Sequence, residues 1–234
     1  MSKNKLARFA EMETFEHVFQ PGIQEVFHDD FHLKGKWSEW FENNNPIVLE
    51  LGCGKGEYTV GLARKYPDIN FIGVDIKGAR MWLGAKQSRN EALKNVAFLR
   101  TRIELISSFF GEDEVSAIWI TFPDPQLKKN RRKKRLTAPG FLSYYARFIK
   151  SDGLIHLKTD SRALYEFTKR VISHNQLPVV GDTDDLYHSR LQDVAAGIKT
   201  FYEQMFLNEG IPIKLLIFKL GNKQSFTWHP DDEK

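Results

Sequence analysis

Short apolar runs alternate with amphipathic stretches along most of the chain after residue 46. Runs of four to seven mostly apolar residues predict strands at 47–51, 70–76, 96–99, 116–122 and 154–158. Helical spacing of apolar positions predicts helices at 58–66, 79–93, 103–110, 139–149 and 161–175. Strands covered on both faces read as continuous apolar runs, and alternation with helices implies right-handed crossovers between parallel strands. The pattern therefore predicts an α/β fold with a doubly wound, mostly parallel sheet.

The two ends of the chain depart from this rhythm. Residues 213–220 alternate between apolar and polar positions and no predicted helix follows them, which favours a terminal antiparallel strand. Residues 1–45 are polar with scattered aromatic side chains, and a short helix over about 30–42 is expected to pack its tryptophans on the main domain. We expect residues 1–25 to be mobile or ordered by a ligand. The predicted organisation is a partly mobile N-terminal extension, 1–45, followed by one domain, 46–234.

Composition narrows the class of protein. Of the 234 residues, 41% are hydrophobic and 27% are charged, values that are ordinary for a soluble globular protein. The single cysteine, Cys53, excludes an internal disulfide framework and fits a reducing compartment. The start of the chain lacks the apolar region of a signal peptide, and no run reaches the roughly 18 apolar residues of a membrane span. We therefore expect a cytoplasmic protein.

One histidine pair is a candidate metal site. His28 and His32 flank Asp29 and Asp30, but no third ligand with recognisable spacing accompanies them. Solvated or structural roles are the better interpretation, and no metal is expected.

The first predicted strand ends in a glycine-rich loop, Glu50-Leu51-Gly52-Cys53-Gly54-Lys55-Gly56. Glycines let the backbone turn tightly and approach a ligand at the start of a helix. A phosphate would be repelled by Glu50, whereas a cationic ligand would be attracted to it. Asp75 ends the second strand 23 residues after Gly52, the separation at which an acid binds ribose hydroxyls. A positively charged adenosine compound satisfies both acids; an ordinary turn with two solvated carboxylates is the alternative.

This loop and the acid after it resemble motif I and the following acidic position of class I S-adenosylmethionine-dependent methyltransferases. The resemblance implies a seven-stranded Rossmann-like sheet, with S-adenosyl-L-methionine as the cofactor. It also implies cofactor contacts from Glu50, Gly52, Gly54 and Asp75. The adenine is then expected at the end of the third strand. Arg102 and Ile103 stand where the family usually has Asp or Asn, so backbone groups or Glu104 must hold the base there.

The fourth predicted strand ends in Phe122-Pro123-Asp124-Pro125. Proline fixes φ and removes a backbone donor, so the Asp124 carboxylate is expected on a stiff loop. A structural turn is the alternative, because Asp and Pro are common in turns. Lys or Arg then fills seven of the eight positions 128–135, in a chain of net charge +4 and pI near 9.0. Such a run repels itself unless a polyanion is present, so phosphate contact with nucleic acid is favoured over a solvated loop.

Four motifs in this order resemble the tRNA (guanine-N7)-methyltransferase family. They are the glycine loop with its acid, the Phe-Pro-Asp-Pro loop with its basic run, Lys158-Thr159-Asp160 after the fifth strand, and Thr200-Phe201-Tyr202-Glu203. The family usually has Trp where this chain has Gln126. The resemblance covers about residues 47–220. It implies methylation of guanine N7 in tRNA, at position 46 of the variable loop.

Guanine N7 carries a lone pair and no proton, so its methylation needs alignment rather than a general base. Asp124 is the predicted catalytic residue, positioning the guanine beside the cofactor and contacting both. Asp160 and Glu203 are suited to accept from the N1–H and 2-amino edge, whereas Lys128 and Thr200 suit oxygen atoms. The predicted substrate contacts are Lys128, Asp160, Thr200, Phe201, Tyr202 and Glu203.

Structural alternatives exist for these motifs. Asp160 could cap the helix that starts at Ser161, and Thr200 with Glu203 matches a capping box. Two other functions also stay open: methylation of a small molecule or protein, and a non-catalytic RNA-binding subunit of the same fold. Sequence does not decide between a monomer and a homodimer.

Overall fold

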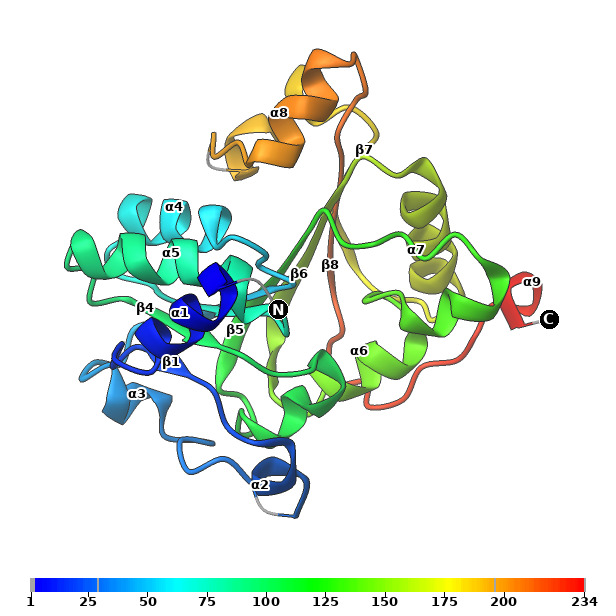
Figure 1. Ribbon diagram of the computed structural model, residues 1–234. Helices are drawn as coiled ribbons and strands as arrows, with labels where there is room; N and C mark the ends of the chain where they lie inside the picture. Colours follow the sequence, from blue (N-terminus) through cyan, green and yellow to red (C-terminus); the bar gives the residue numbers. More distant parts are fainter. Residues whose placement is uncertain (1–2, 29, 196, 234) are drawn as a thin grey trace. The chain divides into compact units, whose positions relative to one another are not determined.

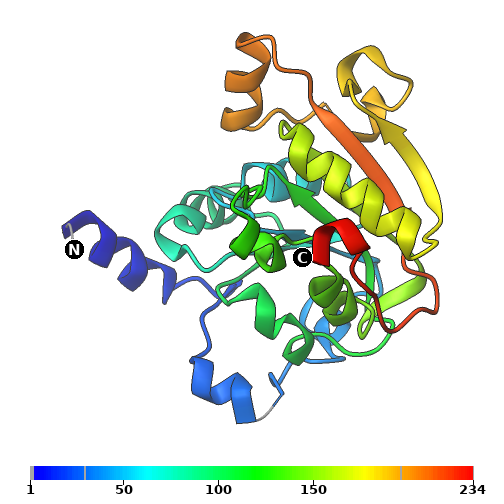
Figure 2. The same ribbon diagram turned by 90° about the vertical axis from the view of Figure 1, so that its right-hand side faces the viewer.

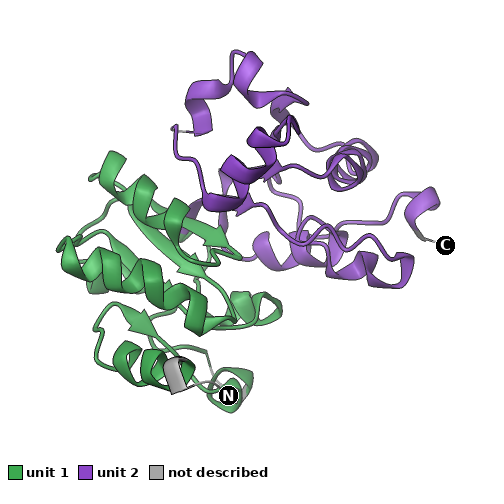
Figure 3. Ribbon diagram, turned by 45° about the horizontal axis from the view of Figure 1, so that its top comes forward, with its two compact units in different colours: residues 1–114 green, residues 115–234 purple. Residues whose placement is uncertain are grey.

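The computed structural model describes residues 3–28, 30–195 and 197–233. The chain divides into two compact units, unit 1 with residues 1–114 and unit 2 with residues 115–234 (Figure 3). The fold is of the predicted α/β class, with a mostly parallel sheet. Eight strands are found in the described residues, where seven were expected. Within the described parts of the chain, no helix is both long and apolar enough to span a bilayer.

Unit 1 contains four parallel strands in the order β1-β4-β3-β2. Three of them were predicted, and their residues are buried throughout because both faces of these strands are covered. The short strand β1 was not predicted, because two residues give no periodic signal. The bounds are β1 Val18–Phe19, β2 Ile47–Leu51, β3 Asn70–Val74 and β4 Val96–Leu99.

In unit 1, α1 precedes the first strand, α2 to α5 connect the strands, and η1 follows the last one (Figure 1). Helix α4 ends just before Pro67, because a residue that precedes proline disfavours helical backbone. Helices α4 and α5 contact each other, and α1 packs on α5. The bounds are α1 Lys3–Met12, α2 Ile23–His28, α3 Trp37–Trp40, α4 Glu57–Lys65, α5 Gly78–Asn90 and the 3-10 helix η1 Ile103–Ser108.

The N-terminal residues are part of unit 1. The helix expected over 30–42 is shorter, since only α3 forms there, but Trp37 is fully buried as predicted. Its indole Nε1 donates to the carbonyl oxygen of Phe109 at 2.8 Å. β1 pairs with β4, so this part of the predicted extension adds a strand to the parallel strands of unit 1. The predicted mobility of residues 1–25 stays a prediction.

Unit 2 contains the strand order β5-β6-β8-β7. β5 and β6 are parallel, whereas β8 is antiparallel to both β6 and β7, which confirms the predicted terminal antiparallel strand. β7 was not predicted, because it is short and mostly exposed. The bounds are β5 Val115–Thr121, β6 Ile149–Thr159, β7 Val179–Thr183 and β8 Lys214–Lys219.

The main helix of unit 2, α7, packs on β6 and β8 (Figure 2). It buries Leu164, Phe167 and Val171 at helical spacing. Pro139 begins α6, where its missing N–H has no partner to lose. The bounds are η2 Lys129–Lys134, α6 Pro139–Tyr145, α7 Arg162–His174, η3 Leu186–His188, η4 Gln192–Ala195, α8 Phe201–Asn208 and α9 Pro230–Glu233.

Candidate cofactor and substrate site

The glycine loop of unit 1 turns sharply between β2 and α4. Gly52, Gly54 and Gly56 have φ angles of 78°, 56° and 73°, a region that side-chain-bearing residues seldom adopt. The Gly52 N–H donates to the Val74 carbonyl oxygen at 2.8 Å, which fastens the loop to the end of β3. The sequence therefore places glycine where the backbone requires it.

These glycines differ in what surrounds them. A Cβ at Gly56 would lie 2.8 Å from Cε1 of Phe98 and 3.1 Å from Cα of Gly84, so Gly56 is required by packing. A Cβ at Gly54 would have the Gly52 carbonyl oxygen as its nearest neighbour, at 3.9 Å. Gly54 thus presents bare backbone, as a loop that binds a small ligand must.

Two acids order this loop. Glu50 is 4% exposed, and its Oε2 accepts from the Thr59 backbone N–H at 2.8 Å and from the Thr59 hydroxyl. Asp75 follows β3, and its Oδ2 accepts from the Gly54 N–H at 2.9 Å. The other oxygen of Asp75 accepts from the Lys77 N–H at 2.7 Å. The structure thus brings two predicted cofactor residues, Gly54 and Asp75, into direct contact.

Cys53 lies in this loop and is buried. Burial raises the pKa of its thiol well above the ordinary range, and the negative charges of Glu50 and Asp75 raise it further. The thiol is therefore neutral. Cys53 therefore serves as a small buried residue of the loop.

The predicted adenine position follows β4. Arg102 is exposed and precedes η1, and Ile103 is half-buried as the first residue of η1. Sequence reasoning missed a neighbour from α1: the Arg100 guanidinium lies 4.5 Å from the centre of the Phe9 ring. A Cβ at Gly78, three residues after Asp75, would lie 2.6 Å from Phe9. No motif in residues 1–25 signals this packing, because it depends on α1 meeting the start of α5.

In unit 2, the loop after β5 carries Asp124. Phe122 and Gln126 both have φ of 46°, which is uncommon for residues other than glycine. The Phe122 N–H donates to the Lys158 carbonyl oxygen at 2.8 Å, and the Gln126 N–H donates to Asp124 Oδ1 at 2.9 Å. Asp124 is exposed, so the loop presents its carboxylate outward.

This loop lines a pocket of about 310 Å³. A carboxylate and two cations share the pocket. The lining residues are Asp124, Pro125, Gln126, Leu127, Lys128 and Arg131.

The basic run is not one uniform solvated segment. Residues 129–134 form the 3-10 helix η2, and Lys128, Arg131 and Lys134 are exposed. Arg135 departs from the prediction of a solvated or phosphate-facing run, because it is 9% exposed.

The Thr200–Glu203 motif forms a capping box at the start of α8, so the structural alternative is confirmed. Glu203 is fully buried; its Oε1 lies 2.7 Å from Nζ of Lys158 and accepts from the Tyr187 hydroxyl at 2.7 Å. Burial raises the pKa of Tyr187, and its bond to Glu203 adds to the shift. Phe201 and Tyr202 are 58% and 41% exposed. Within this motif, Thr200 and Glu203 form the helix cap, whereas Phe201 and Tyr202 are exposed to solvent.

Asp160 follows β6 and is half-buried. Burial raises the pKa of its carboxyl group. The alternative that Asp160 caps α7 is wrong: the hydroxyl of Ser161 accepts from the Leu164 N–H at 3.3 Å and supplies the cap. The Asp160 backbone carbonyl accepts from Nζ of Lys214 at 3.0 Å.

Three motifs meet within unit 2. Thr121 at the end of β5 pairs with Lys158 on β6, so Asp124 and Asp160 follow neighbouring strand ends. The Phe122 ring stacks on Phe206 of α8 with centroids 5.9 Å apart, and Lys158 binds Glu203 of the same helix. Among the described residues no group of three or more potential metal ligands is found, and Asp29 lies outside them.

Comparison with known proteins identifies the class. Residues 44–216 match the family model Methyltransf_4, described as "Putative methyltransferase". The structure of the 16S rRNA methyltransferase KamB has the same fold, with a TM-score of 0.60 and 14% identity over 80% of this chain and 93% of that one. An A1408 methyltransferase of the 30S ribosome, from an uncultured bacterium, gives a TM-score of 0.54 with 16% identity over 80% of this chain and 97% of that one. The fold is that of a methyltransferase.

The sequence comparison is more specific. A protein of Bacteroides fragilis named tRNA (guanine-N(7)-)-methyltransferase is 57% identical over 94% of this chain and 87% of its own length. A protein of Porphyromonas gingivalis with the same name is 53% identical over 95% of this chain and 92% of its own length. The chain belongs to the tRNA (guanine-N(7)-)-methyltransferase family.

Proposed function

We propose that the chain transfers a methyl group from S-adenosyl-L-methionine to N7 of a guanine in tRNA, with position 46 of the variable loop as the target by family resemblance. The observation that carries the proposal is the pocket of unit 2, where the exposed Asp124 shares one hollow with Lys128 and Arg131. A carboxylate suits the donor edge of guanine, and cations suit the adjoining phosphates. Family membership supports the same reaction.

The residues of unit 1 suit this cofactor. S-adenosylmethionine supplies an electrophilic methyl group on a positively charged sulfur. Glu50 offers a buried acid toward a cationic amino-acid end, and Gly54 offers bare backbone beside it. Asp75 is half-buried at the place where ribose hydroxyls are expected. Arg102 and Ile103 flank the expected adenine, and Asp124 is expected to contact both cofactor and guanine.

The chemistry needs positioning and charge stabilisation from the protein. A bond forms between N7 and the methyl carbon while the carbon–sulfur bond breaks and its electron pair stays on sulfur. The purine gains positive charge, which makes its N1–H and 2-amino group stronger donors. Asp124 accepts from this edge, and Asp160 is the second acceptor. No general base is required, because N7 has no proton to lose.

The Thr200–Glu203 motif serves this reaction in two ways. Glu203 is buried on Lys158, so it holds α8 in place instead of reaching the base itself. Thr200 caps the same helix. Phe201 and Tyr202 present aromatic side chains on which a flipped base or its neighbour can stack. Lys128 and the exposed cations of η2 bind the tRNA backbone.

The direct test is incubation of the protein with methyl-labelled S-adenosylmethionine and unmodified tRNA, followed by nuclease digestion and mapping of the labelled nucleoside. We expect 7-methylguanosine at position 46 and none in a matched tRNA with adenosine at that position. Label in another nucleoside, or equal label in the adenosine variant, would contradict the proposal.

Two controls separate the alternative functions. A methyltransferase for a small molecule or protein should turn over independently of salt, whereas tRNA binding should weaken with a slope of about −0.7 to −0.9 per phosphate contact. A non-catalytic RNA-binding subunit should show no tight binding of S-adenosylhomocysteine in calorimetry.

A further inference from the structure

Arg135 differs from the other cations of the basic run. It is 9% exposed, while Lys133 and Lys134 immediately before it are exposed to solvent. Its guanidinium lies 4.4 Å from the centre of the Phe167 ring on α7, an arrangement typical of cation–π stacking. A buried, stacked arginine is poorly placed to contact the phosphates of a flexible polyanion. The groups that it binds lie inside unit 2.

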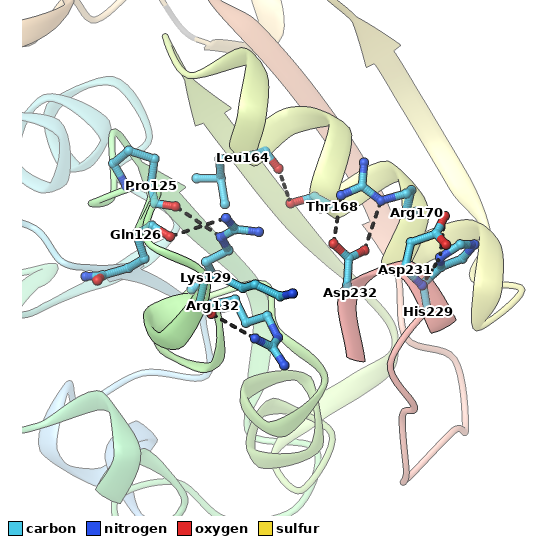
Figure 4. Close-up of polar contacts among 11 residues, drawn as sticks. Pro125, Gln126, Lys129, Arg132, Leu164, Thr168, Arg170, His229, Asp231 and Asp232 are labelled. Carbon is cyan, nitrogen blue, oxygen red and sulfur yellow. Dashed lines mark hydrogen bonds and ion pairs between the residues drawn. The ribbon is translucent and has the colours of Figure 1, made fainter. Parts of the chain in front are cut away.

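Those contacts lead to the loop that carries Asp124. Arg135 Nε donates to the carbonyl oxygen of Pro125 at 3.1 Å, and Nη2 donates to that of Gln126 at 3.2 Å. Figure 4 shows both accepting carbonyl groups. Two adjacent carbonyl oxygens match the planar fork of a guanidinium, which lysine cannot reproduce.

The start of the loop is held by the Phe122 N–H, which donates to the Lys158 carbonyl oxygen, but backbone donors are scarce after it. Pro123 and Pro125 have no N–H to donate, and Phe122 and Gln126 adopt the left-handed backbone region. Gln126 is the link to the carboxylate, because its N–H donates to Asp124 Oδ1 at 2.9 Å while its carbonyl accepts from Arg135. The Gln126 N–H lies in the same planar peptide unit as the Pro125 carbonyl, so the two bonds from Arg135 fix that unit and, through it, the direction of the Asp124 carboxylate.

Arg135 is itself anchored at both backbone groups. Its N–H donates to the Arg132 carbonyl oxygen at 3.1 Å, and its carbonyl accepts from the Ala138 N–H at 2.9 Å. Burial lowers the pKa of Arg135, and the negative charge of Asp232 acts in the opposite direction. Asp232 is held by a two-pronged ion pair with Arg170, at 2.8 and 2.9 Å (Figure 4).

We propose that Arg135 is a positioning residue, which holds Asp124 in its working direction through the backbone of Gln126 and does not contact tRNA phosphates. The proposal rests on the methylation proposed above for its kinetic consequence, but the loop restraint exists without substrate. The seven cations of the basic run thus have two roles. The exposed ones bind phosphate, and Arg135 orders the loop that carries Asp124.

The kinetic test compares Arg135→Lys, which keeps the charge but loses the fork, with Lys134→Ala, which removes an exposed charge. For Arg135→Lys we expect kcat to fall about 10- to 100-fold, since small displacements of an aligned group cost this much. Its KM for tRNA and its salt dependence should stay near those of the unmodified protein. For Lys134→Ala, the slope of the logarithm of tRNA affinity against the logarithm of salt concentration should instead become shallower by about 0.7 to 0.9. Arg147→Lys, at an exposed arginine outside the run, controls for the substitution itself.

A second measurement does not depend on activity. Hydrogen exchange of peptides covering residues 122–128 should be faster in Arg135→Lys than in the unmodified protein, and unchanged in Lys134→Ala and Arg147→Lys. If the unmodified protein fails to methylate tRNA but this exchange difference is found, the proposed function is wrong and the loop restraint stands. An Arg135→Lys protein with unchanged exchange and unchanged kcat would overturn the inference. The inference would also be overturned if Arg135→Lys made tRNA binding less dependent on salt, or if its hydrogen exchange became faster throughout unit 2.

Discussion

Gly54 and Gly56 share a left-handed backbone, yet side-chain substitution should affect them differently. Gly56→Ala adds to the backbone penalty of about 1–2 kcal/mol a clash with Phe98 and Gly84 of about 1–3 kcal/mol. Gly54→Ala carries the backbone penalty alone, but its methyl group would stand at the position where the cofactor is expected. We expect Gly56→Ala to lower the free energy of unfolding by about 2–5 kcal/mol. Gly54→Ala should mainly weaken binding of S-adenosylhomocysteine.

Urea unfolding and calorimetry would measure both effects. Equal losses of stability in the two variants, with cofactor affinity preserved in Gly54→Ala, would contradict this division of roles.

Asp124 offers a second test at the scale of single residues. Asp124→Asn keeps an oxygen that can accept from the Gln126 N–H but removes the negative charge. We expect kcat for tRNA methylation to fall by about 10²- to 10³-fold, the range found when one preorganised electrostatic group is removed. The free energy of unfolding should change by less than about 0.5 kcal/mol, because Asp124 is exposed. Full methylation by this variant would refute the catalytic role of Asp124.

On the scale of secondary-structure elements, a buried ion pair joins β6 to α8. Both side chains of Lys158 and Glu203 are fully buried, and Glu203 also accepts from Tyr187. Glu203→Ala would leave a buried ammonium uncompensated, so we expect a loss of about 3–5 kcal/mol in the free energy of unfolding. The double variant Lys158→Met with Glu203→Leu should lose less, since no charge is left unpaired. Urea titrations of the variants decide; a double variant less stable than Glu203→Ala would contradict the argument.

The pairing of β5 with β6 contains a pH-dependent element. His156 is 6% exposed and stacks on Trp119 with centroids 4.1 Å apart. Burial lowers the pKa of His156 to about 4. Between that value and the ordinary value near 6.5, the unfolded chain binds more protons than the folded one. Stability is therefore full above about pH 6.5 and is lost as the pH falls toward 4, by up to about 3 kcal/mol.

Chemical unfolding at a series of pH values would test this for the unmodified protein and for His156→Phe. Carboxyl groups also titrate below pH 5, so the difference between the two proteins isolates the histidine. The variant should lose less stability between pH 6.5 and 4.5; parallel curves would show that His156 contributes nothing.

Several element boundaries follow from local pattern alone. β2 and β4 occupy the predicted residues 47–51 and 96–99, because buried parallel strands give uninterrupted apolar runs. β7 is mostly exposed and gives no such run. The cap of α7 shows another limit: Asp160 and Ser161 are both good caps, and only the path of the backbone after β6 selects Ser161.

For the molecule as a whole, the distribution of charge matters more than the net charge of +4. Five cations of the basic run are exposed, so this segment should account for a slope of up to about −4 in the logarithm of tRNA affinity against the logarithm of salt concentration. Replacing Lys133 and Lys134 together by Ala should flatten the slope by about 1.4 to 1.8. Filter binding at several salt concentrations would measure it. An unchanged slope would remove η2 from the tRNA-binding surface. The five exposed cations are Lys128, Lys129, Arg131, Lys133 and Lys134.

The predicted cofactor and substrate residues are also divided between the two units. The glycine loop, Asp75, Arg102 and Ile103 belong to unit 1, whereas Asp124, Lys128, Asp160 and the Thr200–Glu203 motif belong to unit 2. The predicted boundary at residue 45 does not coincide with this division. Composition marks where a strand pattern begins, but it carries no information on which strands share contacts.

The sequence by itself determined the α/β class, the strand ends where the predicted site residues stand, and the family. These features depend on apolar periodicity and on short motifs whose residues are neighbours along the chain. Tertiary structure alone decided which residues of each motif face inward. From the sequence, Glu203 was a guanine contact or part of a capping box, and Arg135 was one cation of a phosphate-binding run. Both side chains are buried, Glu203 against Lys158 and Arg135 against the carbonyl oxygens of Pro125 and Gln126. A charged side chain is buried only where distant segments supply its partners, and those partners come together only on folding.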